Sequence, residues 1–295
     1  IAIPTVTDKV YNGQQQTAGI PEDAGYTVVD NGGTNVGPYT AVVTLVSDNY
    51  IWADGTSAAK ELTYEITSID NTETFEKLEF TATYGDLLKD IITLPAGVQG
   101  TWSIEGATAA TTVGNAGTNT FKAIFTPDAT GNYNGREVEI TVTVGKKAVE
   151  APVDYTKEYT YTGSDITANI PTSTLYTVTN NEAKNVGNYS ATLTLTDSAN
   201  YVWSNGDTLT TTVPYAITKA SVTLSDLVLG GWVYGQAANI PEVTIAKDFS
   251  DDVTVYYEYL VNGVWVETAP TGAGTYTVKA EVAGTANYTG DEITA

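Results

Sequence analysis

Residues 185–203 read NVGNYSATLTLTDSANYVW, and this stretch decides the fold of the chain. It contains a glycine turn, a segment in which apolar and polar residues alternate, and a second turn that ends in Asn-Tyr. The apolar positions of the alternating segment are Tyr189, Ala191, Leu193 and Leu195. A period of two with one apolar face predicts a β-strand that packs on a core and keeps its other face in water.

The same pattern occurs three more times in the chain. Each copy starts at a glycine and ends at an Asn-Tyr pair, and the further copies are Gly37 to Tyr50, Gly117 to Tyr133 and Gly274 to Tyr288. Repetition of one supersecondary unit is typical of an array of small modules. The sequence therefore predicts an all-β protein made of four tandem modules. These are residues 1–69 (module 1), 70–146 (module 2), 147–219 (module 3) and 220–295 (module 4).

The modules are of two types in the order A-B-A-B. In modules 1 and 3 the spacing from Tyr11 to Gly37 equals that from Tyr161 to Gly187, which defines type A. Modules 2 and 4 have a longer middle part and define type B. In module 4 the pair Asn262-Gly263 between two alternating runs predicts a hairpin with a tight turn. In module 2 the segment 86–92 predicts at most a single helical turn.

The aromatic residue near the start of each repeated strand is expected to face the core. In the two type B modules we align Phe121 with Tyr276, which places a two-residue insertion between Gly117 and Phe121. An even insertion leaves the inward face unchanged. The alignment predicts that four aromatic side chains are largely buried: Tyr39, Tyr189, Tyr276 and Phe121.

Composition excludes several classes of function. The 295-residue chain has no Cys, His or Met, and 13 basic against 35 acidic residues give a formal charge of −22. Such a surface repels phosphate backbones and anionic lipids, so neither nucleic acid nor direct membrane contact is expected. No run of residues is long and apolar enough to span a bilayer. Without His, and with acids scattered over turns, no catalytic constellation and no cofactor are expected.

Aromatic residues raise one possible ligand site. Tyr50 with Trp52, and Tyr201 with Trp203, are two residues apart and share a strand face. A flat aromatic platform for a sugar ring is one interpretation, and Trp265 faces the same choice. The favoured interpretation is that these large rings fill module cores.

Acidic loops raise a second possible site. Calcium prefers oxygen ligands, and the candidates lie in matching loops of modules 1 and 3: Asp48, Asp54, Asp197 and Asp207. No stretch has the spaced acidic pattern of an EF-hand. Solvated turns explain these residues more simply, and we favour that interpretation.

Two sets of motifs carry a family resemblance. The segments 185–189 and 200–206, and 272–278 with Asn287-Tyr288, resemble tandem repeats of large bacterial cell-surface proteins and adhesins of Gram-positive type. These are the Tyr-Asp-Gly, MBG and bacterial Ig-like kinds, and Val233-Tyr234-Gly235-Gln236 departs from them by lacking the acid. The resemblance implies small extracellular β-sandwich modules, Ig-like by preference and β-grasp-like as the alternative, with no catalytic residues.

The predicted function is structural. We expect a stalk or spacer segment of a cell-surface or cell-wall-attached protein that projects a binding domain found elsewhere. The alternative is an adhesin whose repeats bind host glycans such as mucin, or a host protein. The short boundaries between modules predict an elongated monomer. Module 4 stops several residues before the end of the strand that corresponds to 136–145, so we expect a shortened final strand and a C-terminally truncated module.

Overall fold

The computed structural model describes all residues 1–295 and divides into two compact units, residues 1–147 and 148–295. The division falls within one residue of the predicted boundary between modules 2 and 3. Apart from strands, the chain forms one helical turn, α1 (Leu88–Ile91), inside the predicted segment 86–92. The all-β prediction is confirmed.

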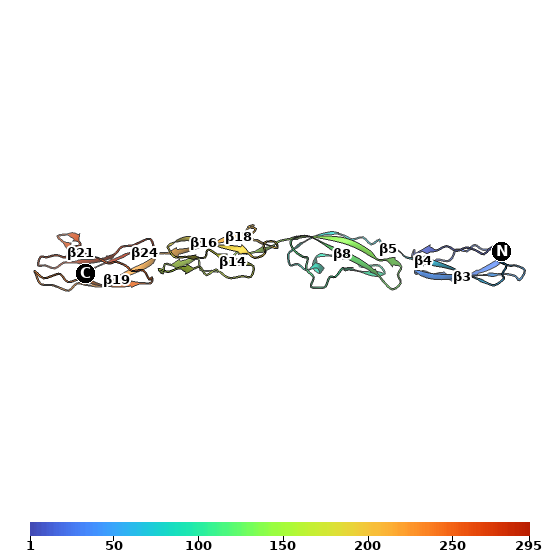
Figure 1. The fold of residues 1–295 in the computed structure, drawn as a ribbon, viewed down its shortest axis with the longest axis horizontal. Coiled ribbons are helices and arrows are strands. Elements are labelled where there is room, and N and C mark those ends of the chain that lie inside the picture. Colours follow the sequence, from blue (N-terminus) through green and yellow to red (C-terminus); the bar gives the residue numbers. More distant parts are fainter. The chain divides into compact units, whose positions relative to one another are not determined.

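Module 1 is organised around one four-stranded sheet. The sheet order is β1-β4-β3-β2, with bounds Lys9–Val10, Lys60–Thr67, Gly37–Leu45 and Tyr26–Val29. The central strands β3 and β4 are antiparallel neighbours (Figure 1), whereas the short β1 runs parallel to β4. Two buried clusters lie against this sheet, one around Tyr64 and Ile66 and the other around Trp52.

Module 3 repeats this arrangement. Its sheet order is β12-β18-β16-β14, with bounds Glu158–Thr160, Thr210–Thr218, Gly187–Leu195 and Tyr176–Thr179. Within this sheet the earliest strand, β12, is again parallel to the latest strand, β18. Two short pairs accompany the sheet: β13 (Ile166–Thr167) with β15 (Glu182–Ala183), and β11 (Lys147–Val149) with β17 (Tyr201–Trp203).

Module 2 has a longer main sheet. Its order is β6-β10-β8-β7, with bounds Glu79–Thr83, Arg136–Gly145, Gly117–Pro127 and Gly100–Ile104. The strands β6 and β10 are parallel over five residue pairs, from Glu79↔Thr141 to Thr83↔Gly145. A separate parallel pair joins β5 (Ile69–Asp70) to β9 (Tyr133–Asn134).

Module 4 contains two sheets that pack together through β19. The first has the order β20-β19-β24, with bounds Glu242–Lys247, Ala220–Val228 and Tyr288–Thr289. The second has the order β22-β21-β23-β25, with bounds Val264–Val266, Tyr256–Val261, Val278–Val282 and Asp291–Thr294. The predicted hairpin is present, since Asn262 (φ 50°) and Gly263 (φ 80°) connect β21 to β22. The final strand β25 has four residues.

The structure corrects the alignment of the two type B modules. Arg136 and Asp291 each lie four residues after the asparagine of an Asn-Tyr pair, and they pair with Phe125 and Val282 respectively. Phe121 therefore corresponds to Val278. The two additional residues of module 2 lie in the turn after β8 and not before Phe121. The predicted and observed alignments differ by two residues, which is an even number. The assignment of the inward face of β8 is therefore unaffected.

Candidate functional site: the junctions within each unit

The contacts that recur in both units lie where a type A module meets the type B module that follows it. In unit 1 this first junction is centred on Asn132, whose side chain is 2% exposed. Its Oδ1 accepts a hydrogen bond from the Val36 amide at 2.9 Å, and its main-chain oxygen accepts one from the Ile69 amide at 3.2 Å. Its Nδ2 donates to Asn35 Oδ1 at 3.1 Å and to Gln99 Oε1 at 2.6 Å. One asparagine thus satisfies groups from both modules.

The second junction, in unit 2, has the same geometry around Asn287. Its Oδ1 accepts from the Val186 amide at 3.0 Å, and its main-chain oxygen accepts from the Ala220 amide at 3.1 Å. Its Nδ2 donates to Asn185 Oδ1 at 3.1 Å. The two junctions are therefore built from equivalent residues that make equivalent bonds.

A tyrosine of the type A module lies beside each of these asparagines. Tyr11 packs edge-on against Tyr133, with ring centroids 5.9 Å apart, and its hydroxyl accepts a hydrogen bond from Gln99 Nε2 at 3.0 Å. Tyr161 packs against Phe249 at 6.0 Å and donates its hydroxyl proton to the Asp251 carboxylate. That bond, together with burial, raises the pKa of Tyr161 above its ordinary value.

Apolar packing is continuous through both junctions. Tyr133 of module 2 packs on the module 1 cluster that contains Tyr11 and Ile66. In unit 2, Tyr161 and Ile217 of module 3 belong to one buried cluster with Val222 and Leu224 of module 4. Because this apolar surface is buried only while the two modules are together, each junction favours a fixed arrangement of its pair.

A local hydrogen bond positions the loop that reaches each junction. The hydroxyl of Tyr39 donates to Asn35 O, and that of Tyr189 to Asn185 O, both at 2.8 Å. The equivalent bonds in the type B modules are Tyr276 to Gly272 O at 3.1 Å and Asn119 Nδ2 to Asn115 O at 2.7 Å. This repeated bond supports Asn119, and not Phe121, as the counterpart of Tyr276.

The four strand aromatics are less buried than predicted, so the prediction that they are largely buried is wrong. Tyr39, Tyr189, Tyr276 and Phe121 are all half-buried. Tyr39 and Tyr189 lie at the beginning of their strands, and Tyr276 lies two residues before β23. At each of these positions the hydroxyl bonds a loop carbonyl and part of the ring remains in water. The fully buried positions come later in the strands, at Ala41, Val43, Ala191 and Leu193.

Two of the three candidate sugar-binding tryptophans are core residues. Trp52 is 0% exposed and Trp203 is 1% exposed, so neither offers a surface to a ligand. Their indole N–H groups donate to Ala58 O at 2.8 Å and to Leu209 O at 3.2 Å. The core interpretation is confirmed for both, and the platform interpretation is wrong. Trp265 is half-buried, with the Lys279 ammonium 5.5 Å from its ring centroid.

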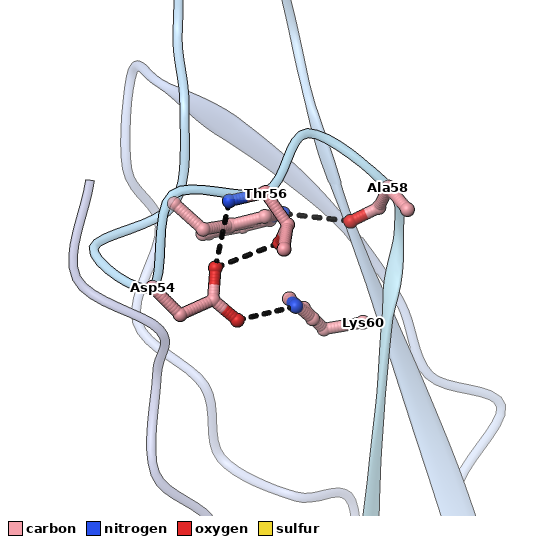
Figure 2. Close-up of polar contacts among 5 residues, drawn as sticks. Asp54, Thr56, Ala58 and Lys60 are labelled. Carbon is pink, nitrogen blue, oxygen red and sulfur yellow. Dashed lines mark hydrogen bonds and ion pairs between the residues drawn. The ribbon is translucent and has the colours of Figure 1, made fainter.

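The calcium candidates are engaged in local contacts. Asp54 accepts hydrogen bonds from the Thr56 amide at 3.0 Å and hydroxyl at 2.7 Å, and it pairs with Lys60 at 2.6 Å (Figure 2). These partners lower the pKa of Asp54 to about 2. Asp197 accepts from Asn200 Nδ2 at 2.8 Å, and Asp207 accepts from Asn205 Nδ2 at 2.9 Å. Asp48 is exposed, and no group of three or more acidic side chains gathers to hold a metal ion.

One hollow in module 4 is lined by aromatic rings. It has a volume of about 340 Å³ and is bordered by Trp232, Tyr234 and Tyr276, with Tyr234 78% exposed. In module 2 the corresponding Tyr84 continues β6, and its amide donates to Gly145 O at the end of β10. In module 4 residues 229–234 belong to no strand.

Comparisons with known proteins give no family. No family model and no curated protein matches the chain. Among solved structures it is similar to Drosophila N-cadherin EC1-4, at 11% identity over 99% of this chain and 98% of that one, with a TM-score of 0.19. It is also similar to Sidekick-1 immunoglobulin domains 1-5, at 7% identity over 99% and 79%, with a TM-score of 0.23.

A third similar structure is a Bacteroides ovatus protein, SGBP-B of the mixed-linkage glucan utilization locus, in complex with a heptasaccharide. The identity is 12% over 78% of this chain and 70% of that one, with a TM-score of 0.15. TM-scores this low carry no argument about the function of the chain.

The only helix of the chain is the single turn α1, and no helix is long and apolar enough to cross a membrane.

Proposed function

We propose that this chain is a non-catalytic structural spacer in which each A–B pair of modules acts as one stiff element. The observation that carries the proposal is the recurrence of the asparagine-centred junction in both units, with the same donors and acceptors. A spacer must hold its parts at a defined distance, and a hinge between modules defeats that purpose. A buried junction with direct hydrogen bonds opposes hinge motion.

The covalent connection supports the same function. A single residue, Ser68, stands between β4 and β5 in unit 1, and Lys219 alone stands between β18 and β19 in unit 2. Such a connection leaves little slack for reorientation. Stiffness therefore has two sources in each pair, the short linker and the junction contacts.

The setting of the spacer follows from the resemblance to bacterial surface repeats. We place the chain outside the cell, in a surface or cell-wall protein whose binding domain lies elsewhere. The charge of −22 supports a solvated, monomeric segment that resists self-association. Burial of Trp52 and Trp203 removes the main argument for the adhesin alternative, in which the repeats bind glycans.

Distances between spin labels test this function directly. The chain has no Cys, so labels are placed only where cysteines are introduced. Thr40→Cys with Thr101→Cys reports on unit 1, and Ser190→Cys with Thr244→Cys on unit 2, because all four side chains are exposed on strands. A stiff pair gives one narrow distance distribution in each unit.

The matched variants make the test specific. Asn132→Ala broadens the unit 1 distribution and leaves unit 2 unchanged, whereas the exposed Asn49→Ala changes neither. A broad distribution in the unsubstituted protein contradicts the proposed function.

A further inference from the structure

In three modules the earliest and the latest strands of the four-stranded sheet run parallel to each other. In module 1 β1 pairs with β4, in module 3 β12 pairs with β18, and in module 2 β6 pairs with β10. Matching side-chain bonds reinforce the two type A pairs, since Thr67 Oγ1 donates to Lys9 O and Thr218 Oγ1 to Tyr159 O, both at 3.1 Å. The parallel arrangement is therefore a repeated feature and not a local irregularity.

Parallel pairing decides how a module responds to a pull on its ends. The chain enters the four-stranded sheet of each of these modules at the start of the earliest strand and leaves it at the end of the latest strand. When the ends are drawn apart, two parallel neighbours slide along each other, and all the hydrogen bonds between them carry the load together. Two antiparallel neighbours loaded at adjacent ends separate one bond at a time.

The junctions continue the same arrangement. In unit 1, β5 directly follows β4 and pairs in parallel with β9, and only Gly135 separates β9 from β10. Ser68 Oγ and Asn134 Oδ1 are hydrogen-bonded at 2.5 Å beside this pair, and Asn134 Nδ2 donates to Asp70 at 2.7 Å. In unit 2, β19 pairs in parallel with β24, which leads into β25. A pull that arrives through β4 is thus transferred across the junction to the last strand of the next module.

We propose that the modules are load-bearing, and that they resist stretching between their ends through parallel strands held in shear. The inference rests on the proposed spacer function and adds a mechanical role to it. Module 2 is the most resistant of the three, because its β6–β10 ladder has five residue pairs, against two for β1–β4 and three for β12–β18. The ladder extends further through bonds from the Thr141 amide to Leu78 O at 2.8 Å and from the Tyr84 amide to Gly145 O at 2.9 Å.

Single-molecule stretching of the full chain tests the proposal by changing only the direction of the pull. Two variants share the same C-terminal handle and differ in one attachment cysteine. Glu76→Cys lies before β6, so that the pull loads β6 against β10 in shear. Thr118→Cys lies at the beginning of β8, opposite Thr143, so that the pull peels β8 from β10. Both side chains are exposed, which leaves the fold intact.

The rupture of module 2 is recognised by the chain released up to Gly145, about 240 Å from Glu76 and about 95 Å from Thr118. We expect the rupture force from Thr118 to be lower by about half or more, because the bonds break in sequence and not together. Modules 3 and 4 are stretched identically in both variants and serve as the internal reference. Equal forces, or a higher force from Thr118, overturn the load-bearing role. The spacer function is judged separately by the label distances, so the failure of one is distinguishable from the failure of the other.

Discussion

The Nδ2 atom of Asn132 lies 3.1 Å from Oδ1 of Asn35, a residue 97 positions earlier, and Asn287 and Asn185 repeat this contact at 3.1 Å over 102 positions. The contact joins the Asn-Tyr turn of a type B module to the loop before the central strand of a type A module. Its recurrence shows that the pair of modules, and not the single module, is the unit that the sequence repeats.

Removing the junction amide is expected to destabilise unit 1. Asn132→Ala leaves the part-buried amide of Val36 without its acceptor, which costs about 2 kcal/mol of unfolding free energy. Asn287→Ala acts in the same direction but less strongly, because Asn287 is only half-buried. Urea denaturation measures both effects. The control Asn49→Ala replaces an exposed Asn of the same Asn-Tyr motif and changes stability by less than about 0.5 kcal/mol. If Asn132→Ala matches this control, the junction bonds contribute nothing.

Features set by local chemistry could be predicted from the sequence. Alternation from Tyr189 to Leu195 predicts the strand observed as β16, and Asn262-Gly263 predicts the β21–β22 hairpin, since both residues accept a positive φ. The tryptophan pair Trp52 and Trp203 could be assigned to the core because large rings in matching positions of small modules have few other places to go.

The junctions could not be predicted because they depend on contacts between residues far apart in the chain. In sequence, Asn132 and Asn287 look the same as Asn49 and Asn200, which occupy the Asn-Tyr motif of the type A modules. Only the folded chain shows that the type B copies meet the preceding module. The predicted position of the two-residue insertion is wrong for a related reason, because matching Phe121 to Tyr276 relies on residue type alone. Strand register and the Asn119 side-chain bond give the correct match.

Core and strand-start aromatics are expected to differ in their contribution to stability. Trp203→Ala removes a fully buried ring and costs about 4 kcal/mol. Tyr189→Ala removes a half-buried ring together with its bond to Asn185 O, and we expect about 2 kcal/mol. Thermal or urea unfolding measures the loss of unfolding free energy in each of the two variants. A Tyr189→Ala effect as large as that of Trp203→Ala argues that the ring is more deeply buried than the structure has it.

Asp54 should contribute to the loss of unfolding free energy at acid pH. Hydrogen bonds from Lys60 and Thr56 lower its pKa from 3.8 to about 2. A lowered folded-state pKa means that the stabilising contribution is complete above 3.8 and is lost as the pH falls toward 2. Carboxyl NMR titration of Asp54 measures the midpoint, which Lys60→Gln raises. A midpoint near 4 in the unsubstituted protein shows that the ion pair does not form in solution.

The loss of unfolding free energy at alkaline pH should depend on buried tyrosines. Burial raises the pKa of several of them above 10.0, including Tyr64, Tyr176, Tyr215 and Tyr259. A raised folded-state pKa means that stability is complete below 10 and falls as the pH rises further, because the unfolded chain ionises first. Tyrosinate absorbance should therefore show a component that titrates above pH 10, and the unfolding free energy should fall over the same pH range. A single free titration of all tyrosines contradicts this assignment.

Native-state hydrogen exchange at four amides tests most directly whether each A–B pair is one element. Val36 and Ile69 donate to the side chain and main chain of Asn132, and Val186 and Ala220 donate in the same way to Asn287. If the junctions hold, these four amides open only with the pair, and their opening free energies equal those of core amides such as Ala41 and Val142. If they exchange at the rates of exposed loops while the cores stay protected, the modules are independent of each other and the account is wrong.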